Sequence, residues 1–289
     1  MIQTMTSDFD LSSRFVDLAA PEPSTNLTEY GKLNALANWL MSTGLRSRDS
    51  LKDSATMARE LIVFSKSSAY HTSSRALPGI KISKHAFANQ EASVDRSIEI
   101  GIHIADRAID SGVSLLFLTS DEEARANDVE ILIGALTRAD AASVAVRTDV
   151  GDQEWMNTVI HIRDEMFALR DLIADPTALL ARTKSFDISA MLGLILQSAN
   201  RATPLVLIGE RAYCAALLAQ RVSHRSRDWL IPALDLTSPA GSLAQQRLDR
   251  LPILELAMPF AVDYLSQATL TAPIIDAMLE LLSSNSSTI

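Results

Sequence analysis

The sequence predicts a doubly wound α/β fold: a mainly parallel sheet with helices on both faces, plus a small helical part built from the chain ends. Three observations support this prediction. The 289 residues are 47% apolar, which is enough for a sizeable core. A helix, a short apolar strand and a second helix follow one another over residues 97–139, and a strand and helix recur over residues 203–222. Such alternation is typical of parallel sheets.

The central unit has the clearest pattern. Ile98, Ile102 and Ile109 recur at helical spacing, and Gly112 follows where a left-handed C-cap is needed. Residues 113–118 are then a short apolar run of the kind expected for a strand that is covered on both faces. Its neighbour in the sheet is predicted to be Leu205 to Ile208, so that both belong to one parallel sheet.

The remaining elements follow in chain order. A helix is predicted from Tyr30, strands at residues 60–64 and 141–146, and helices at residues 155–173, 178–180 and 186–199. Residues 1–26 are predicted to form a polar arm. Its apolar cluster, Phe15 to Ala20, is of the kind that contacts a partner subunit. We expect an α/β domain at residues 46–264, and a small helical part formed by residues 1–45 with 265–289.

Composition excludes several functions. The net charge is −9 with scattered basic residues and only 5% aromatics, which disfavours nucleic acid and anionic membranes as partners. No window approaches the roughly 18 apolar residues of a membrane span. The single Cys214 cannot form an intramolecular disulfide, and the first residues lack a signal-peptide core, so we expect a cytoplasmic protein. The five histidines show no metal-ligand spacing, and no metal or cofactor is expected.

The turn from Thr119 to Asn127 lies where the carboxyl edge of the sheet should be, which is where ligands bind in open α/β sheets. It contains no glycine. Ser120 and Glu123 have the spacing of a capping box, and the acidic residues 121–123 would neutralise a helix N-terminus. We therefore predict that this turn is the first turn of a helix capped by Ser120, in preference to a phosphate site.

Several segments resemble a known family. Residues 31–40 (GKLNALANWL), 186–195 (FDISAMLGLI), 204–212 (PLVLIGERA) and 226–231 (SRDWLI) are similar to motifs of the nicotinate-nucleotide:dimethylbenzimidazole phosphoribosyltransferases, which serve the cobalamin lower-ligand pathway. The resemblance implies the doubly wound fold, a homodimer, and nicotinate mononucleotide with an azole or phenolic base as substrates. It covers about two-thirds of the chain.

The resemblance also assigns candidate site residues. Asp263 lies near the position of the family's catalytic glutamate, which would make it the general base, and Asp187 keeps a family carboxylate in shortened form. Gly209 is retained, and with Ser120 and Asp187 it would line the nucleotide pocket. The family's glycine-rich phosphate loop, its histidine turn and the glycines around the catalytic glutamate are absent from this chain.

Two functions remain open at this point. One is a divergent phosphoribosyltransferase with weak or absent activity, because the phosphate-binding and base-binding motifs are degraded. The alternative is a non-catalytic dimeric binding or regulatory protein on the same fold. The loss of glycines and the acidic turn favour poor binding of nucleotide phosphate.

Overall fold

A computed structural model describes residues 10–22, 27–45, 57–65, 77–86, 93–121, 127–146, 151–256 and 264–285. Its centre is one five-stranded sheet of order β2-β1-β3-β4-β5, in which every pair of neighbouring strands is parallel. The strands are β1 (Arg59–Ser65), β2 (Ile80–Ala86), β3 (Leu115–Ser120), β4 (Leu205–Leu207) and β5 (Leu230–Pro232). The predicted fold class is confirmed, and the two predicted central strands pair directly, with Leu116 opposite Leu205.

Helices surround this sheet. They are α1 (Leu11–Phe15), α2 (Asn34–Ser42), α3 (Val94–Asp110), α4 (Asp128–Thr137), α5 (Ala141–Val144), α6 (Asp152–Leu169), α7 (Pro176–Thr183), α8 (Phe186–Asn200), α9 (Glu210–Val222), α10 (Pro239–Leu248) and α11 (Tyr264–Asn285). Two 3-10 helices, η1 (Gly31–Leu33) and η4 (His224–Trp229), precede α2 and β5. Within the described part of the chain, no helix is both long and apolar enough to cross a membrane.

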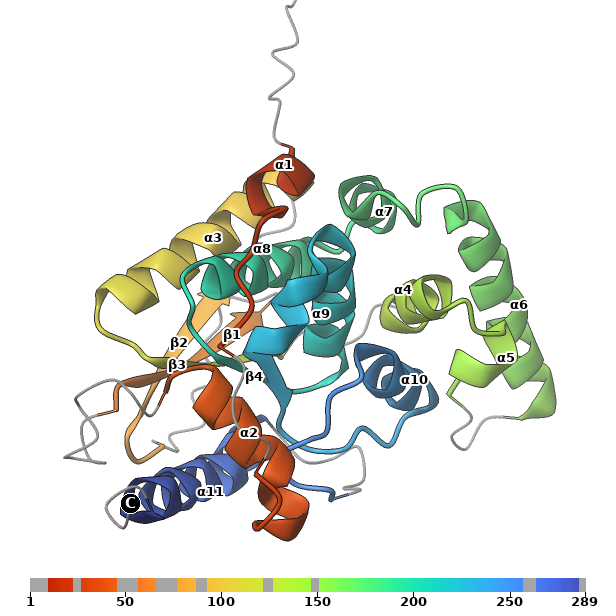
Figure 1. Ribbon diagram of the computed structural model, residues 1–289. Coiled ribbons are helices and arrows are strands. Elements are labelled where there is room, and N and C mark those ends of the chain that lie inside the picture. The colour runs from red at the N-terminus through yellow and green to blue at the C-terminus, as the bar shows by residue number, and fades with distance from the viewer. Residues whose placement is uncertain are drawn as a thin grey trace, which may run out of the picture.

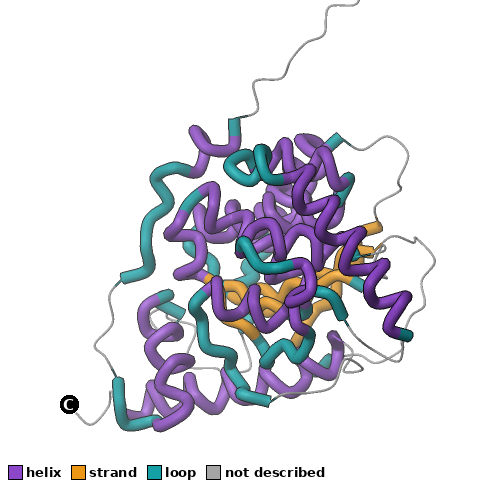
Figure 2. Tube along the Cα trace, turned by 90° about the vertical axis from the view of Figure 1, so that its right-hand side faces the viewer, coloured by secondary structure: helices purple, strands orange, loops and turns teal. Residues whose placement is uncertain are grey.

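The strands bury both of their faces. In β1, Ile62 and Phe64 join the core beneath α3, α8 and α9, whereas Leu61 and Val63 join the core beneath α2 and α11. Successive side chains of a strand point to opposite faces, so one continuous apolar run serves both layers. Figure 2 shows the sheet between the two helical layers.

The smaller layer comes from the two chain ends. Helices α2 and α11 pack against each other (Figure 1), and Asp276 of α11 forms an ion pair with Arg59 of β1. This arrangement agrees with the predicted small helical part. The boundaries at residues 45 and 265 remain a prediction, because the helices share one core with the sheet.

The N-terminal arm packs partly on its own chain. Leu11, Phe15 and Leu18 are at most 4% exposed and belong to the chain's own core. The Trp229 indole donates a hydrogen bond of 2.9 Å to the carbonyl of Ala19. Phe15 and Leu18 of the predicted cluster therefore pack on their own chain, whereas Val16 is 63% exposed, and a contact with a partner subunit remains a prediction.

Helices α3 and α8 approach each other closely where they cross, because each has a glycine at the contact. A Cβ atom on Gly101 would lie 1.8 Å from the carbonyl oxygen of Ala190, and one on Gly193 would lie 2.1 Å from that of Ile98. Neither position can accept a side chain without moving a helix backbone. This crossing fixes α8, whose first turn carries Asp187.

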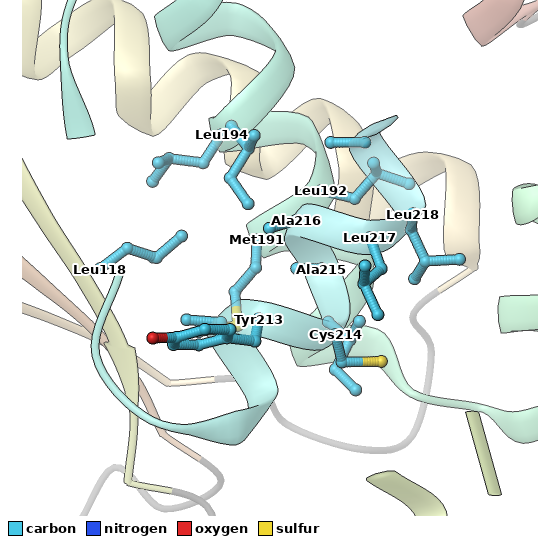
Figure 3. Close-up of a cluster of buried hydrophobic side chains, with 14 of the residues drawn as sticks. Leu118, Met191, Leu192, Leu194, Tyr213, Cys214, Ala215, Ala216, Leu217 and Leu218 are labelled. Atoms are coloured by element: carbon cyan, nitrogen blue, oxygen red, sulfur yellow. The ribbon is translucent and has the colours of Figure 1, made fainter. Parts of the chain in front are cut away.

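Helix α9 packs against α8 through an apolar face. Figure 3 shows Tyr213 of α9 beside Met191 of α8, and Cys214 and Leu192 belong to the same buried core. The Tyr213 hydroxyl donates to the carbonyl of Leu234 at 3.2 Å, and burial raises the pKa of both Tyr213 and Cys214 above their usual ranges. Cys214 is a buried, inert thiol, because its thiolate is strongly disfavoured.

Two local predictions were wrong. Residues 141–144 form the short helix α5 instead of a strand, with the Ser143 hydroxyl donating to the carbonyl of Asp140. Strand β2 was missed because only Ile80 of its seven residues is fully buried, so its pattern resembles a loop.

Candidate functional site

The strand order defines where a ligand would bind. In an open sheet of order 2-1-3-4-5 the connections reverse direction between β1 and β3, and the crevice lies at the carboxyl ends of those strands. Here β1 ends at Ser65 and β3 ends at Ser120, and the backbone amide of Asp121 donates to the carbonyl of Phe64 at 2.9 Å. The candidate site is the set of side chains that gather at this edge.

Ser120 does not cap a helix, so that prediction is wrong. It is the last residue of β3 and pairs with Phe64 of β1, because the strand ladder continues through it. Helix α4 begins later, at Asp128, after Asn127 in the left-handed conformation with φ of 60°. The negative charge at the start of this helix comes from Asp128 and Glu130, while Glu122 and Glu123 lie outside the described residues.

Asp187 lies at the carboxyl edge, and its predicted role in a nucleotide pocket remains a prediction. It is in the first turn of α8, its side chain is only 2% exposed, and the Ser120 hydroxyl donates to its Oδ2 at 3.3 Å. Two predicted site residues are thus brought together by strand and helix, although they are far apart in sequence.

The main partner of Asp187 is Arg211, in the first turn of α9. The Arg211 Nε donates to Asp187 Oδ2 at 2.5 Å, and its Nη2 donates to Oδ1 at 2.8 Å. The same guanidinium donates to both carboxylate oxygens of Asp128, each at 3.1 Å. We call Ser120, Asp128, Asp187 and Arg211 the Arg211 cluster.

The cluster is stable only as a whole, because its charges are buried. Arg211 and Asp128 each expose 9% of the side chain. Burial by itself lowers the pKa of Arg211, but the hydrogen bonds and ion pairs with Asp187 and Asp128 outweigh it, and the pKa lies above its usual range. A guanidinium held in this way by two carboxylates has little capacity left for a ligand phosphate.

Two glutamates add negative charge beside the cluster. Burial raises the pKa of Glu130, and the neighbouring Glu210 and Asp128 raise it further. Burial also raises the pKa of Glu210, which is partly offset by a hydrogen bond with Ser238 at the start of α10. Glu130 Oε2 is buried and has no hydrogen-bond partner among the described residues. The N-termini of α4, α9 and α10 therefore meet in an acidic environment.

Gly209 connects β4 to α9 and is required for its backbone. Its φ of 81° and ψ of 162° belong to a region that only glycine adopts freely. A Cβ atom there would have ordinary contact with Thr119 Oγ1 at 3.9 Å. Gly209 thus lies at the carboxyl edge of the sheet. Its conformation sets the direction of helix α9, which carries Arg211.

Asp263, the predicted general base, lies outside the described residues, so its position remains a prediction. Sequence reasoning also overlooked Asp128 and the role of Arg211. A signal was available, because an arginine in the first turn of a helix opposes the helix dipole and needs an acidic partner. The sequence does not say which of the chain's 35 acidic residues that partner is.

This fold and its carboxyl-edge site define a class, the phosphoribosyltransferases: a family model with that description matches residues 50–288. The chain belongs to the nicotinate-nucleotide:dimethylbenzimidazole phosphoribosyltransferase family. An enzyme of that name from Corynebacterium glutamicum strain R is 37% identical over 172 residues, covering 59% of this chain and 48% of the relative. One from Mycobacterium avium strain 104 is 32% identical, covering 66% and 54%.

A crystal structure from Thermus thermophilus, also titled as a nicotinate-nucleotide-dimethylbenzimidazole phosphoribosyltransferase, superposes with a TM-score of 0.68 at 16% sequence identity. The match covers 91% of this chain and 92% of that chain, and it establishes the fold. The chain aligns with only about half the length of the curated relatives.

Proposed function

We propose that this protein is a divergent phosphoribosyltransferase homologue that binds nicotinate mononucleotide weakly or not at all, with weak or absent base phosphoribosylation. The observation that supports this most directly is the Arg211 cluster. Arg211, a cation at the carboxyl edge, is engaged by two buried carboxylates, at 2.5 to 3.1 Å.

Electrostatics explains the expected weakness. A carboxylate about 5 Å from a singly charged anion opposes it by roughly 3 kcal/mol at an effective dielectric constant near 20. Asp128, Asp187, Glu130 and Glu210 surround one arginine here, although the raised pKa values of the two glutamates reduce their charge. Separating Arg211 from its carboxylates would leave buried charges unpaired, which costs about 3–5 kcal/mol.

The substrates in this proposal come from the names of the relatives, a nicotinate nucleotide and dimethylbenzimidazole. The resemblance in sequence extends the base to other azoles or phenols. Asp263 would be the general base, and Asp187, Gly209 and Ser120 would line the pocket. Displacement of nicotinate at the ribose carbon requires a positioned base and a held phosphate. Asp187 is poorly suited to bind the nucleotide, because both of its carboxylate oxygens accept hydrogen bonds from Arg211.

Titration calorimetry with nicotinate mononucleotide tests the proposal. We expect dissociation constants no tighter than about 1 mM, and no detectable product when dimethylbenzimidazole is added. Micromolar binding that is lost in both Asp263→Ala and Asp187→Ala would overturn it. Because Asp187→Ala can unfold the chain, circular dichroism of each variant is the control, and Asp263→Ala can be judged alone.

The alternative, a non-catalytic dimeric binding protein, gains support from one surface. Met156, Ile160 and Phe167 lie along α6 and expose 51%, 42% and 63% of their areas. Figure 1 shows α6 on the outside of the molecule. Apolar stripes of this kind often mark protein interfaces, and a second copy of the chain would cover this one.

Light scattering at micromolar concentration tests the homodimer. The wild-type chain should have the mass of a dimer, and Ile160→Glu should shift it to the monomer without loss of helicity. A monomeric wild-type chain contradicts the dimer. A dimer that is unaffected by Ile160→Glu would mean that a different surface is used.

A further inference from the structure

A basic groove lies at the opposite end of the helices that carry the Arg211 cluster. It has a volume of about 350 Å³, and four basic residues line it: Arg221, His224, Arg227 and Arg247. We call it the amino-edge groove. Arg221 lies near the end of α9 and Arg247 near the end of α10, and both helices begin at the carboxyl edge. The groove is therefore separated from the candidate catalytic site by the length of these helices.

The charge of the groove is unusual for this chain. Three arginines face one carboxylate, Asp249, in a protein whose net charge is −9. Cations at helix C-termini are favoured by the helix dipole, and Arg221 acts in this way, because its Nη2 donates to the carbonyl of Leu136 at the end of α4, at 3.2 Å. The dipole therefore favours Arg221 and also Arg247, which lies in the last turn of α10, so it is Arg227 that needs a different explanation.

Arg227 is held less tightly than a structural arginine would be. Its nearest carboxylates are Asp228, 3.8 Å from Nε, and Asp249, 3.7 Å from Nη1, and both distances exceed that of a good hydrogen bond. Its Nε is buried and has no hydrogen-bond partner in the part of the chain that the structure describes. A buried donor without an acceptor costs about 1–3 kcal/mol. The Nη1 atom is the nitrogen of Arg227 that lies beside the groove, since Asp249 also lines it.

The rest of the lining fits a small organic anion. Gln220 and Gln246 provide amide groups, and Leu136 and Leu217 provide apolar surface. Guanidinium groups bind phosphate through paired N–H donors, and a pocket of this volume is in the range of ligand sites. We propose that the amino-edge groove binds a phosphate dianion, either inorganic phosphate or the phosphate group of a small phosphomonoester.

Titration calorimetry at constant ionic strength tests this proposal with two probes, inorganic phosphate and glycerol 3-phosphate. Both should bind to one site per chain, and the tighter of the two identifies the source of the phosphate. Arg247→Gln and Arg227→Gln should each weaken binding at least tenfold, which is about 1.4 kcal/mol. Arg163→Gln is the matched control, because Arg163 is an exposed arginine on α6 that pairs with Asp164, and its affinity should equal that of the wild type.

The proposal is overturned if neither probe binds, or if Arg247→Gln binds as tightly as Arg163→Gln. Arg227→Gln can also weaken the fold, since Arg227 lies near two carboxylates. Arg247 is exposed and belongs to no ion pair among the described residues, so its variant decides the question. Phosphate also stabilises proteins generally by exclusion from their surfaces, but that effect would be equal in all variants.

Discussion

The two ends of helices α9 and α10 use arginine in opposite ways. At the carboxyl edge, Arg211 is 9% exposed and makes four hydrogen bonds to two carboxylates. At the amino edge, Arg227 is 25% exposed, its nearest carboxylates are 3.7 Å or more away, and its Nε has no partner among the described residues. The donors of the first arginine are paired with carboxylates, whereas the second lines the groove for which we propose a phosphate ligand.

The charge of a residue therefore does not by itself reveal whether the residue can bind a ligand. A buried, fully paired arginine contributes to the unique packing of its elements, and its donors are already used. In the function that we propose, this pairing leaves Arg211 with few donors for a nucleotide phosphate, whereas three other arginines line the amino-edge groove at the far ends of the same helices. Four variants test this contrast between the two ends of the helices.

Arg211→Met should have the largest effect. It leaves Asp128 and Asp187 buried without their cation, and we expect a loss of about 3–5 kcal/mol in the free energy of unfolding. Urea denaturation at pH 7 measures it. Arg247→Met, at the exposed end of α10, is the matched variant and should change stability by less than about 0.5 kcal/mol. Equal losses in the two variants would refute the distinction between the two ends.

Gly193→Ala should destabilise the fold by about 3 kcal/mol, because its Cβ would meet the backbone of Ile98 at 2.1 Å and push α8 away from α3. Thermal unfolding measures the loss. The control is Gly134→Ala, whose Cβ would crowd the flexible end of Met166 and make an ordinary contact of 3.4 Å with Val144. It should be nearly neutral. Because α8 carries Asp187 but does not line the groove, Gly193→Ala should disturb the carboxyl edge and spare phosphate binding.

Gly209→Ala should cost about 2 kcal/mol, since alanine is strained at φ of 81° and ψ of 162° even though space is available. Chemical denaturation of this variant tests whether the backbone at the start of α9 supports the Arg211 cluster. No change in stability would mean that the chain relaxes there, and that the direction of Arg211 is set by packing alone.

Glu130→Gln should have the smallest effect, and it should be stabilising, by about 1 kcal/mol at pH 7. Burial raises the pKa of Glu130 above its ordinary value of 4.5, so the folded chain retains a proton that the unfolded chain has released, and stability falls as the pH rises through this window. The gain from the substitution should therefore disappear as the pH is lowered toward 4.5. Unfolding of both proteins across this range measures it.

Glu99→Gln, which removes an exposed carboxylate from α3, is the control for that experiment and should change stability by less than about 0.5 kcal/mol. If Glu130→Gln is as neutral as Glu99→Gln at pH 7, the carboxylate of Glu130 is better solvated than its burial implies.

The sequence alone determined the parallel sheet and its central pair of strands. Leu115 to Leu118 and Leu205 to Leu207 are apolar at every position, and short runs of this kind between turn signals are typical of a strand covered on both faces. The helical spacing of apolar residues, Gly112 and the family motifs predicted the order of helices and strands along the chain. These features are local, because conformation over a few residues follows from the side chains of those residues.

Which residues make up the site was determined by the tertiary structure. Asp128 and Asp187 lie 83 and 24 residues from Arg211 in the chain, and they meet it because α4, α8 and α9 all begin at one edge of the sheet. The spacing of charged residues along the sequence does not predict that these three side chains come together. The edge strand β2 and the basic groove were missed for the same reason, because strand order and helix packing determine which half-exposed residues become neighbours.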